Sequence, residues 1–393
     1  MAFLGILCLI LLTTLLAGHF SRKLGVPAVI GQLLVGIVLG PAILGWIQPS
    51  SFIHDFSEIG VILLMFMAGL ESDIGLLKRY LRPGILVAMV GVVLPLGLVT
   101  LVSLWFHFSL LLAVFMGVIF TATSVSISVE VLRELNILDS KEGTTILAAA
   151  VVDDVLSVII LSVFVSISGE NTGGNTPSLL IGFVEQILYF IGIYFVVKWI
   201  APFLMHLSQR FLLGAAATIM SLVICLSMAY LADLIGLSAV VGSFFAGIAV
   251  GQTPYKAEID HNMEPIGYAV FIPVFFVSIG LEMNFKGMSD ALWFIIVLTI
   301  VATLTKLIGG GLGARLAGFD LASSYTVGAG MISRGEMALI IAQIGYEAKL
   351  IAPEYYSATI IVIVLTTLVA PFLLKHAAAR QIQVQGQVKS HEN

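Results

Sequence analysis

The chain has 393 residues, of which 59% are hydrophobic and only 10% are charged, and its mean hydropathy is +1.10. A water-soluble protein of this size needs far more polar surface. The composition therefore excludes a water-soluble protein and indicates a protein surrounded by lipid. The net charge of −5 is spread over short loops, and the sequence has no basic face of the kind that binds nucleic acid.

Apolar segments along the chain predict thirteen membrane-spanning helices, and therefore an all-α polytopic membrane protein. A spanning helix needs roughly 20 mostly apolar residues. The first segment lacks the basic start and the small-residue cleavage site of a signal peptide, so we interpret it as a membrane helix. The segments lie at 2–19, 26–46, 56–72, 84–106, 109–132, 143–168, 178–202, 211–233, 235–251, 265–283, 291–315, 322–347 and 354–375.

The distribution of Lys and Arg between these segments predicts the orientation, because cytoplasmic loops carry an excess of them. With the N-terminus outside and the C-terminus in the cytoplasm, the outer loops hold only Lys286 and Lys349. We therefore expect a multi-pass protein of the cell inner (plasma) membrane. The cytoplasmic positions are Arg22, Lys23, Lys78, Arg79, Arg82, Arg133, Lys141, Arg210, Lys256, Arg315, Lys375, Arg380 and Lys389.

An internal repeat appears at an offset of 211 residues. Residues 24–40 read LGVPAVIGQLLVGIVLG, residues 235–251 read IGLSAVVGSFFAGIAVG, and the Gly-Leu-Glu at 69–71 recurs at 280–282. Seven spans separate the matched segments, so the two copies have opposite orientation, as in many secondary transporters. The shared small residues also allow close helix packing, and both interpretations can hold together.

Five ionisable residues fall near the middle of predicted spans, where a charge is costly: Asp153, Asp154, Lys306, Arg334 and Glu336. Full pairing would leave one carboxylate without a protein cation, and a proton or a Na⁺ ion can neutralise it. Adjacent residues on a helix point about 100° apart, so we expect one aspartate to pair with Lys306 and the other to face the ion path. The alternative is a structural ion-pair network, which suits Arg334 and Glu336 better.

Hydroxyl-bearing residues interrupt the fifth span, which reads TATSVSIS at 121–128. The 211 offset places the start of this run on the Gly-rich segment that contains Arg334 and Glu336, so we expect two broken helices that cross. Unwound carbonyls and the hydroxyls of Thr121, Thr123 and Ser124 are hard oxygen donors suited to Na⁺, and Arg334 and Glu336 could offset the helix dipole ends. In the alternative, the hydroxyls bond back to their own helix.

Other acidic residues near span ends are expected to be solvated, including Glu71, Glu130 and Glu282. The sequence shows no nucleophile–base arrangement, phosphate-binding loop or metal-ligand set, so we expect no catalytic residue and no cofactor.

Four motifs resemble bacterial cation/proton antiporters of the CPA2 group, close to the NapA-type Na⁺/H⁺ antiporters, over nearly all of residues 1–376. They are VVDDV at 151–155 together with Lys306, TATSVS at 121–126, SRGEM at 333–337 and GVPAVIGQLLVGIVLGP at 25–41. The resemblance implies that Asp154 binds the ion and that Asp153 pairs with Lys306. An aspartate at position 153, where electroneutral relatives tend to have Asn, implies electrogenic exchange.

The resemblance also implies the domain organisation, with two inverted six-helix repeats and a homodimer. The expected units are a dimer or scaffold domain (1–83 and 211–290), a core ion-transport domain (84–168 and 291–376), a linker helix (169–210) and a disordered cytoplasmic tail (377–393).

The sequence therefore predicts an electrogenic Na⁺/H⁺ antiporter in which Na⁺ and H⁺ compete at Asp154. Exchange of K⁺, or mixed use of Na⁺ and K⁺, is the alternative within the same architecture, and Li⁺ is a further candidate ion. A bile-acid-type symporter would not need Lys306 with an Asp-Asp pair, and a channel would need a continuous polar pore. An intramembrane enzyme is the alternative from a different class. The expected partners are the transported ions and membrane lipid.

Overall fold

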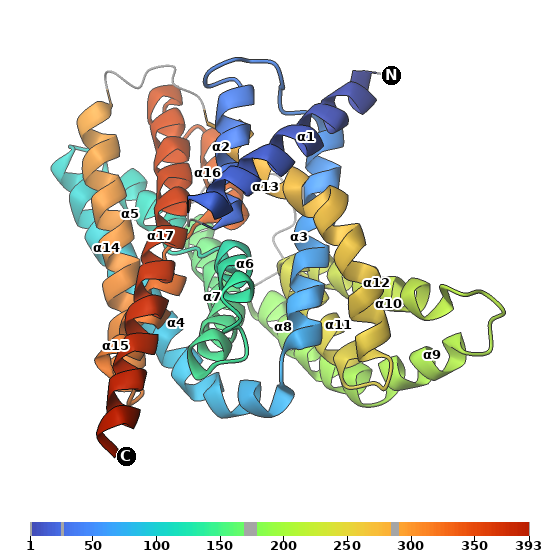
Figure 1. Ribbon diagram of the computed structural model, residues 1–393. Coiled ribbons are helices and arrows are strands. Elements are labelled where there is room, and N and C mark those ends of the chain that lie inside the picture. The colour runs from blue at the N-terminus through green and yellow to red at the C-terminus, as the bar shows by residue number, and fades with distance from the viewer. Residues whose placement is uncertain (1, 25–26, 169–178, 284–290, 393) are drawn as a thin grey trace.

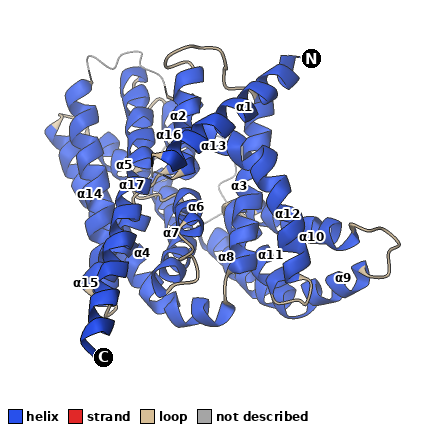
Figure 2. Cartoon of the chain, in the orientation of Figure 1, coloured by secondary structure: helices blue, strands red, loops and turns tan. Residues whose placement is uncertain are grey.

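Figure 1 shows the computed structural model, which describes residues 2–24, 27–168, 179–283 and 291–392. Within these ranges every regular element is a helix (Figure 2). Nine of the described helices are long and apolar enough to cross a membrane, and four shorter apolar helices accompany them. The chain is therefore a multi-pass membrane protein.

The elements are α1 (Ala2–Lys23), α2 (Ala28–Leu39), α3 (Ser51–Glu71), α4 (Ile74–Trp105), α5 (Leu110–Ile119), α6 (Val125–Glu134), α7 (Lys141–Ser168), α8 (Leu179–Phe195), η1 (Val196–Ile200), α9 (Ala201–Ser208), α10 (Ala216–Leu234), α11 (Ala239–Gly251), α12 (Lys256–Ile266), η2 (Gly267–Phe271), α13 (Ile272–Leu281), α14 (Leu292–Leu316), α15 (Leu321–Gly330), α16 (Gly335–Glu347) and α17 (Pro353–Glu392).

Two of the predicted spans are each divided into a pair of short helices. The segment at 109–132 forms α5 and α6, and the segment at 322–347 forms α15 and α16. Both interruptions fall in the polar patches where the sequence predicts broken helices. The number of thirteen spans stays a prediction, because several of the apolar helices are shorter than a full span.

The helices pack in two groups (Figure 1). In the first helix group, which contains α1–α3 and α10–α13, α3 packs against α11, and α2 packs against α13. In the second helix group, which contains α4–α7 and α14–α17, α4 packs against both α7 and α14. Between them in the chain, α8 contacts α7, and α9 contacts α10 and α11.

Glycines bring the backbones of the first helix group close together. A side chain on Gly69 of α3 would collide with the carbonyl oxygen of Phe244 in α11, and one on Gly36 of α2 would collide with that of Val277 in α13. Small residues at such crossings allow close van der Waals packing in a membrane.

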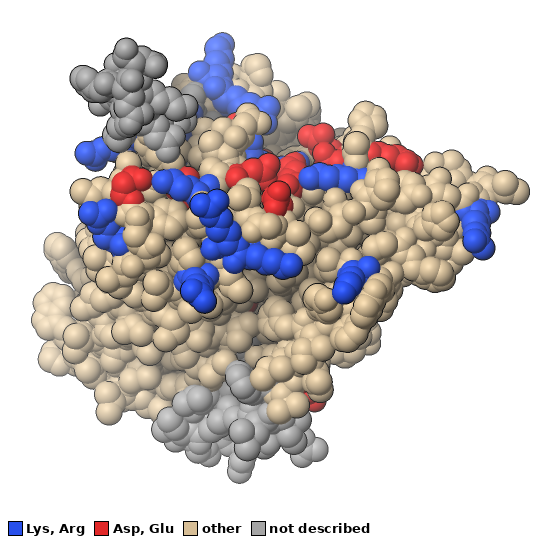
Figure 3. Space-filling view, turned by 90° about the horizontal axis from the view of Figure 1, so that it is seen from below, with Lys and Arg blue, Asp and Glu red and all other residues tan. Residues whose placement is uncertain are grey.

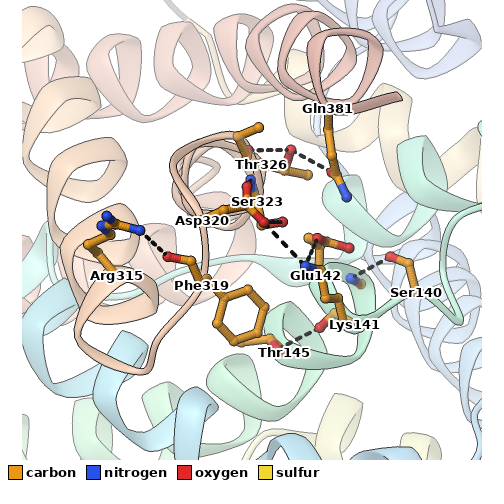
Figure 4. A network of polar contacts seen from close by, with 12 residues as sticks. Ser140, Lys141, Glu142, Thr145, Arg315, Phe319, Asp320, Ser323, Thr326 and Gln381 are labelled. Carbon is orange, nitrogen blue, oxygen red and sulfur yellow. Dashed lines mark hydrogen bonds and ion pairs between the residues drawn. The ribbon is translucent and has the colours of Figure 1, made fainter. Parts of the chain in front are cut away.

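A polar network joins α7, α15 and α17 at one end of the second helix group (Figure 4). Asp320 caps α15 by accepting hydrogen bonds from the backbone N–H and the hydroxyl of Ser323, both at 2.9 Å, and its Oδ2 lies 3.3 Å from Lys141 Nζ. Burial acts to raise the pKa of Asp320, but the Ser323 hydrogen bonds and the Lys141 ammonium together lower it to about 2. The face seen from below in Figure 3 carries many Lys and Arg side chains.

The C-terminal segment differs from the sequence prediction of a disordered tail at 377–393. Helix α17 continues without a break to Glu392, Ala377 and Ala378 are buried, and the Thr326 hydroxyl donates to Gln381 Oε1 at 2.9 Å (Figure 4). Small and polar residues that favour helix extend α17 onto α15 here. The side chains after Gln381 lie outside the described part of the chain.

Candidate functional site

The two interrupted segments meet each other at their breaks. The backbone N–H of Ser124 donates to the carbonyl of Ser333 at 2.9 Å, and the Ser333 hydroxyl donates to the carbonyl of Ser124. One helical turn further on, the Ser128 hydroxyl donates to the carbonyl of Gly330 at 2.6 Å. Each break thus supplies hydrogen-bond partners for backbone groups that the other break leaves unpaired. Such partners are required because the bilayer core holds no water to bond them.

Gly335 makes this close approach possible. Its φ is +50°, in the left-handed region that favours glycine, and a Cβ at this position would collide with the side chain of Ser124.

Arg334 supplies hydrogen bonds to the same crossing. The side chain is fully buried, and its guanidinium donates to the carbonyls of Phe120, Ala122 (3.4 Å) and Ala302 (2.6 Å). Phe120 follows the last residue of α5, where helix termination leaves carbonyls without an intrahelical partner. Arg334 therefore lies at the helix break, as expected from the sequence. The side chain of Glu336, its expected companion, lies outside the described residues.

Asp153 and Lys306 form a buried ion pair inside the second helix group. Lys306 Nζ lies 3.1 Å from Oδ2 and 3.4 Å from Oδ1 of Asp153, and the exposed fractions of the two side chains are 0% and 1%. The pair joins α7 to α14, and glycines let α4 pack closely against α14 beside it, since a Cβ on Gly309 would lie 3.1 Å from the Cα of Gly91 in α4. The positive charge of Lys306 is therefore matched by Asp153 within the group.

Asp154 faces a different environment from its neighbour. Its side chain is half-buried and lines a small pocket between the two helix groups. The other lining residues are apolar and come from α3, α6, α7 and α11: Met65, Val125, Leu147, Ala150, Val151, Val240, Val241 and Phe244. The two aspartates thus point to different places, as the 100° between adjacent helical residues requires.

The hydroxyls expected to act as oxygen donors behave differently from one another. Thr121 donates to the carbonyl of Val118 at 2.7 Å, so it bonds back to its own helix, as in the alternative interpretation. Ser124 takes part in the backbone crossing. Thr123 is buried, and within the described part of the chain its hydroxyl oxygen has no hydrogen-bond partner.

Two further buried hydroxyls were not singled out from the sequence. Among the described residues, the side-chain oxygens of Ser126 and Ser157 also lack a hydrogen-bond partner. Ser157 follows Asp154 by three positions, so both lie on one face of α7, and this spacing could have identified it. Ser126 lies one residue beyond the pocket-lining Val125.

The acidic residues expected to be solvated include one that is buried. Glu130 is 6% exposed and accepts a 2.6 Å hydrogen bond from the Tyr268 hydroxyl of η2. Its predicted solvation is wrong, because α6 ends against the first helix group rather than in water.

The chain is similar to known proteins over nearly its whole length. Residues 8–380 match the protein family described as sodium/hydrogen exchanger, transmembrane. The sequence is 57% identical to a Na⁺/H⁺ antiporter of Enterococcus hirae over 377 residues, covering 96% of this chain and 98% of that one. It is 46% identical to the Na⁺/H⁺-K⁺ antiporter GerN of Bacillus cereus over 378 residues, covering 94% and 95%.

The fold is similar to that of the sodium proton antiporter MjNhaP1 from Methanocaldococcus jannaschii at pH 8. The TM-score is 0.67 at 18% sequence identity, and the match covers 96% of this chain and 97% of that chain.

Proposed function

Because the chain belongs to the sodium/hydrogen exchanger family, we propose that it is a Na⁺/H⁺ antiporter in which the two ions compete for Asp154. The observation that carries the proposal is the different placement of two adjacent carboxylates. Lys306 neutralises Asp153, whereas Asp154 lines a pocket between the helix groups. A carboxylate in such a place binds either a proton or a cation, and competition at one site is sufficient for exchange.

Alternating access follows from the position of Asp154. It belongs to α7 of the second helix group, and the pocket is completed by α3 and α11 of the first. A movement of one group against the other would uncover the carboxylate first to one side and then to the other. In this scheme the first helix group is the dimer or scaffold domain, and the second is the core ion-transport domain.

A thirteen-span, inverted-repeat architecture is supported by the element bounds. The nine long helices become thirteen spans when α2, α11 and the pairs α5–α6 and α15–α16 are added. Adding 211 to the bounds of α5 gives those of α15. The close contact between Gly36 and Gly280 has an equivalent in the close contact between Gly247 and Gly69, because the same offset relates Gly36 to Gly247 and Gly69 to Gly280. Sites of inverted-repeat transporters lie near the midplane, on broken helices.

Oxygen atoms near the crossing would complete the coordination of Na⁺ at Asp154. The buried hydroxyls of Thr123, Ser126 and Ser157 are candidates, since Na⁺ is a hard cation that favours oxygen ligands. The aspartate at position 153, paired with Lys306, supports electrogenic exchange, because electroneutral relatives tend to have Asn at this position. K⁺ is the second candidate ion, because the relative GerN is a Na⁺/H⁺-K⁺ antiporter.

We also infer that the N-terminus lies outside the plasma membrane and that the protein forms a homodimer. The many Lys and Arg side chains on the face in Figure 3, where Asp and Glu also lie, support the orientation, because cytoplasmic loops carry the excess of Lys and Arg. The homodimer is inferred from the family resemblance.

The substitution Asp154→Asn tests the assignment in proteoliposomes. Asn can neither take up a proton nor neutralise Na⁺, so proton movement driven by Na⁺, Li⁺ or K⁺, each added separately, should fall to the level of empty vesicles. Asp233→Asn, at an exposed position at the end of α10, is the matched control and should exchange ions normally. Robust exchange by the purified Asp154→Asn protein would refute the proposed site.

A further inference from the structure

The last two turns of α6 carry charged side chains that bind the first helix group. Glu134 accepts hydrogen bonds from the backbone N–H of Ala28, at 3.0 Å to Oε1 and 3.3 Å to Oε2, and its Oε1 lies 3.6 Å from Arg22. Ala28 is the first residue of α2, and Pro27 before it makes no side-chain capping bond. A carboxylate from the second helix group thus caps α2, where the helix dipole favours negative charge.

Arg133 and Glu130 make the second part of this contact. Arg133 lies 2.8 Å from Glu71 of α3, and its guanidinium lies 5.4 Å from the centre of the Tyr268 ring. The Tyr268 hydroxyl of η2 donates to Glu130 at 2.6 Å. The Arg133 side chain is only 11% exposed and that of Glu71 only 28%, so water screens this ion pair much less than a surface pair.

Helix α6 connects these contacts with the pocket at Asp154. Its first residue, Val125, lines the pocket, and its last, Glu134, binds α2. Ten helical residues span about 15 Å, so α6 reaches from the pocket to the contact with α2. The adjoining loop leads to Lys141, which pairs with Asp320 at the end predicted to be cytoplasmic.

We propose that Glu130, Arg133 and Glu134 form a latch that holds the two helix groups together at the cytoplasmic end, and that its release opens the Asp154 pocket to that side. The proposal rests on the alternating access proposed above and adds the residues that control one of its two openings. They are positioning residues, because they act on the pocket through α6 and contact the first helix group rather than the ion.

Accessibility of the pocket from each side of the membrane tests the latch. The reporter is Val151→Cys, which lines the pocket, in a protein with Cys8 and Cys225 replaced. Its rate of reaction with a membrane-impermeant maleimide is measured in vesicles of either orientation, with and without Tyr268→Phe or Arg133→Gln. Tyr268→Phe removes one hydrogen bond and should raise the rate from the cytoplasmic side by about 2- to 10-fold. Arg133→Gln removes the ion pair with Glu71 and should raise the same rate, and in both variants the outer rate should stay equal or fall.

The matched control is Ser278→Ala, which removes the 2.7 Å hydrogen bond between Ser278 and Ser57 inside the first helix group. This contact does not join the two groups, so reporter accessibility should not change. An equal rise from both sides in the latch variants would indicate general loosening and would overturn the proposal. So would unchanged accessibility together with a lower melting temperature, which is the signature of a purely structural contact.

The readout follows the reporter thiol and requires no ion flux. A wrong assignment of Asp154 would therefore appear in the exchange assay alone, whereas a wrong latch would appear in the labelling rates alone.

Discussion

At the scale of single residues, the Asp153–Lys306 pair is held where water does not reach either charge. Removing one partner of such a pair costs about 3–5 kcal/mol, because the other charge is left buried. We expect Lys306→Ala and Asp153→Asn each to lower thermal stability. The loss should be smaller than this amount if the remaining group becomes neutral, Asp153 by taking up a proton or Lys306 by losing one. The double variant Asp153→Asn with Lys306→Gln should recover much of the loss. Melting curves of the purified proteins measure the coupling, and simple additivity of the two losses would contradict it.

The same double variant separates structure from transport. If the pair takes part in charge movement, the charge carried per Na⁺ in vesicle current measurements should fall although Asp154 is intact. An unchanged charge per Na⁺ would mean that the pair is structural.

The surroundings of a side chain could be predicted from the sequence where helix geometry determines them. They could not be predicted where they depend on residues far away in the chain. The 100° rotation between neighbours was sufficient to expect different environments for Asp153 and Asp154. Nothing local indicates that Glu130 meets Tyr268, which lies 138 positions away, because that contact depends on which helices pack together. The bond from the Thr121 hydroxyl to Val118 is local, and it is the alternative that the sequence already offered for these hydroxyls.

At the scale of elements, the crossing of the broken helices depends on Gly335. An alanine there would adopt φ near +50° at a cost of roughly 1–2 kcal/mol, and its Cβ would also displace Ser124. We therefore expect Gly335→Ala to lower stability by more than the strain alone and to impair exchange. Gly97→Ala in α4 is the matched control, because a Cβ there meets nothing within 4 Å, and alanine favours a helix by up to about 1 kcal/mol. Equal melting temperatures for the two variants would contradict this role of Gly335.

The sequence located both interruptions, because hydroxyls, β-branched residues and glycines weaken a helix in the middle of an apolar span. The sequence did not predict which groups bond to each other across the two interruptions, because the hydrogen bonds between Ser124 and Ser333 join residues 209 positions apart. The prediction of a disordered tail at 377–393 differs from the structure for a related reason. Composition alone indicates a polar tail after residue 376, whereas the contact of Gln381 with Thr326 continues the helix.

At the scale of the whole molecule, the two helix groups divide the work that the proposed mechanism requires. Both pack through close glycine crossings, such as those at Gly36 and Gly69 in the first group and at Gly313 and Gly328 in the second. The second contains the ion pair and the crossing of broken helices, and the Asp154 pocket lies at the boundary. Relative motion of the groups changes the pocket without breaking the buried ion pair, because both members of the pair belong to the same group.

The inverted repeat makes a topological prediction for the whole chain. Helices α2 and α11 are related by the 211 offset, and exposed glutamines follow their C-terminal ends at Gln48 and Gln252. If the copies are inverted, these two positions lie on opposite sides of the membrane, with Gln48 outside and Gln252 in the cytoplasm under the orientation set by Lys and Arg. In a background with Cys8 and Cys225 replaced, Gln48→Cys should react with an impermeant maleimide on intact cells, and Gln252→Cys only in inside-out vesicles. Reaction of both from the same side would remove the inverted repeat, and a simple exchange of the two sides would keep the repeat and reverse the orientation.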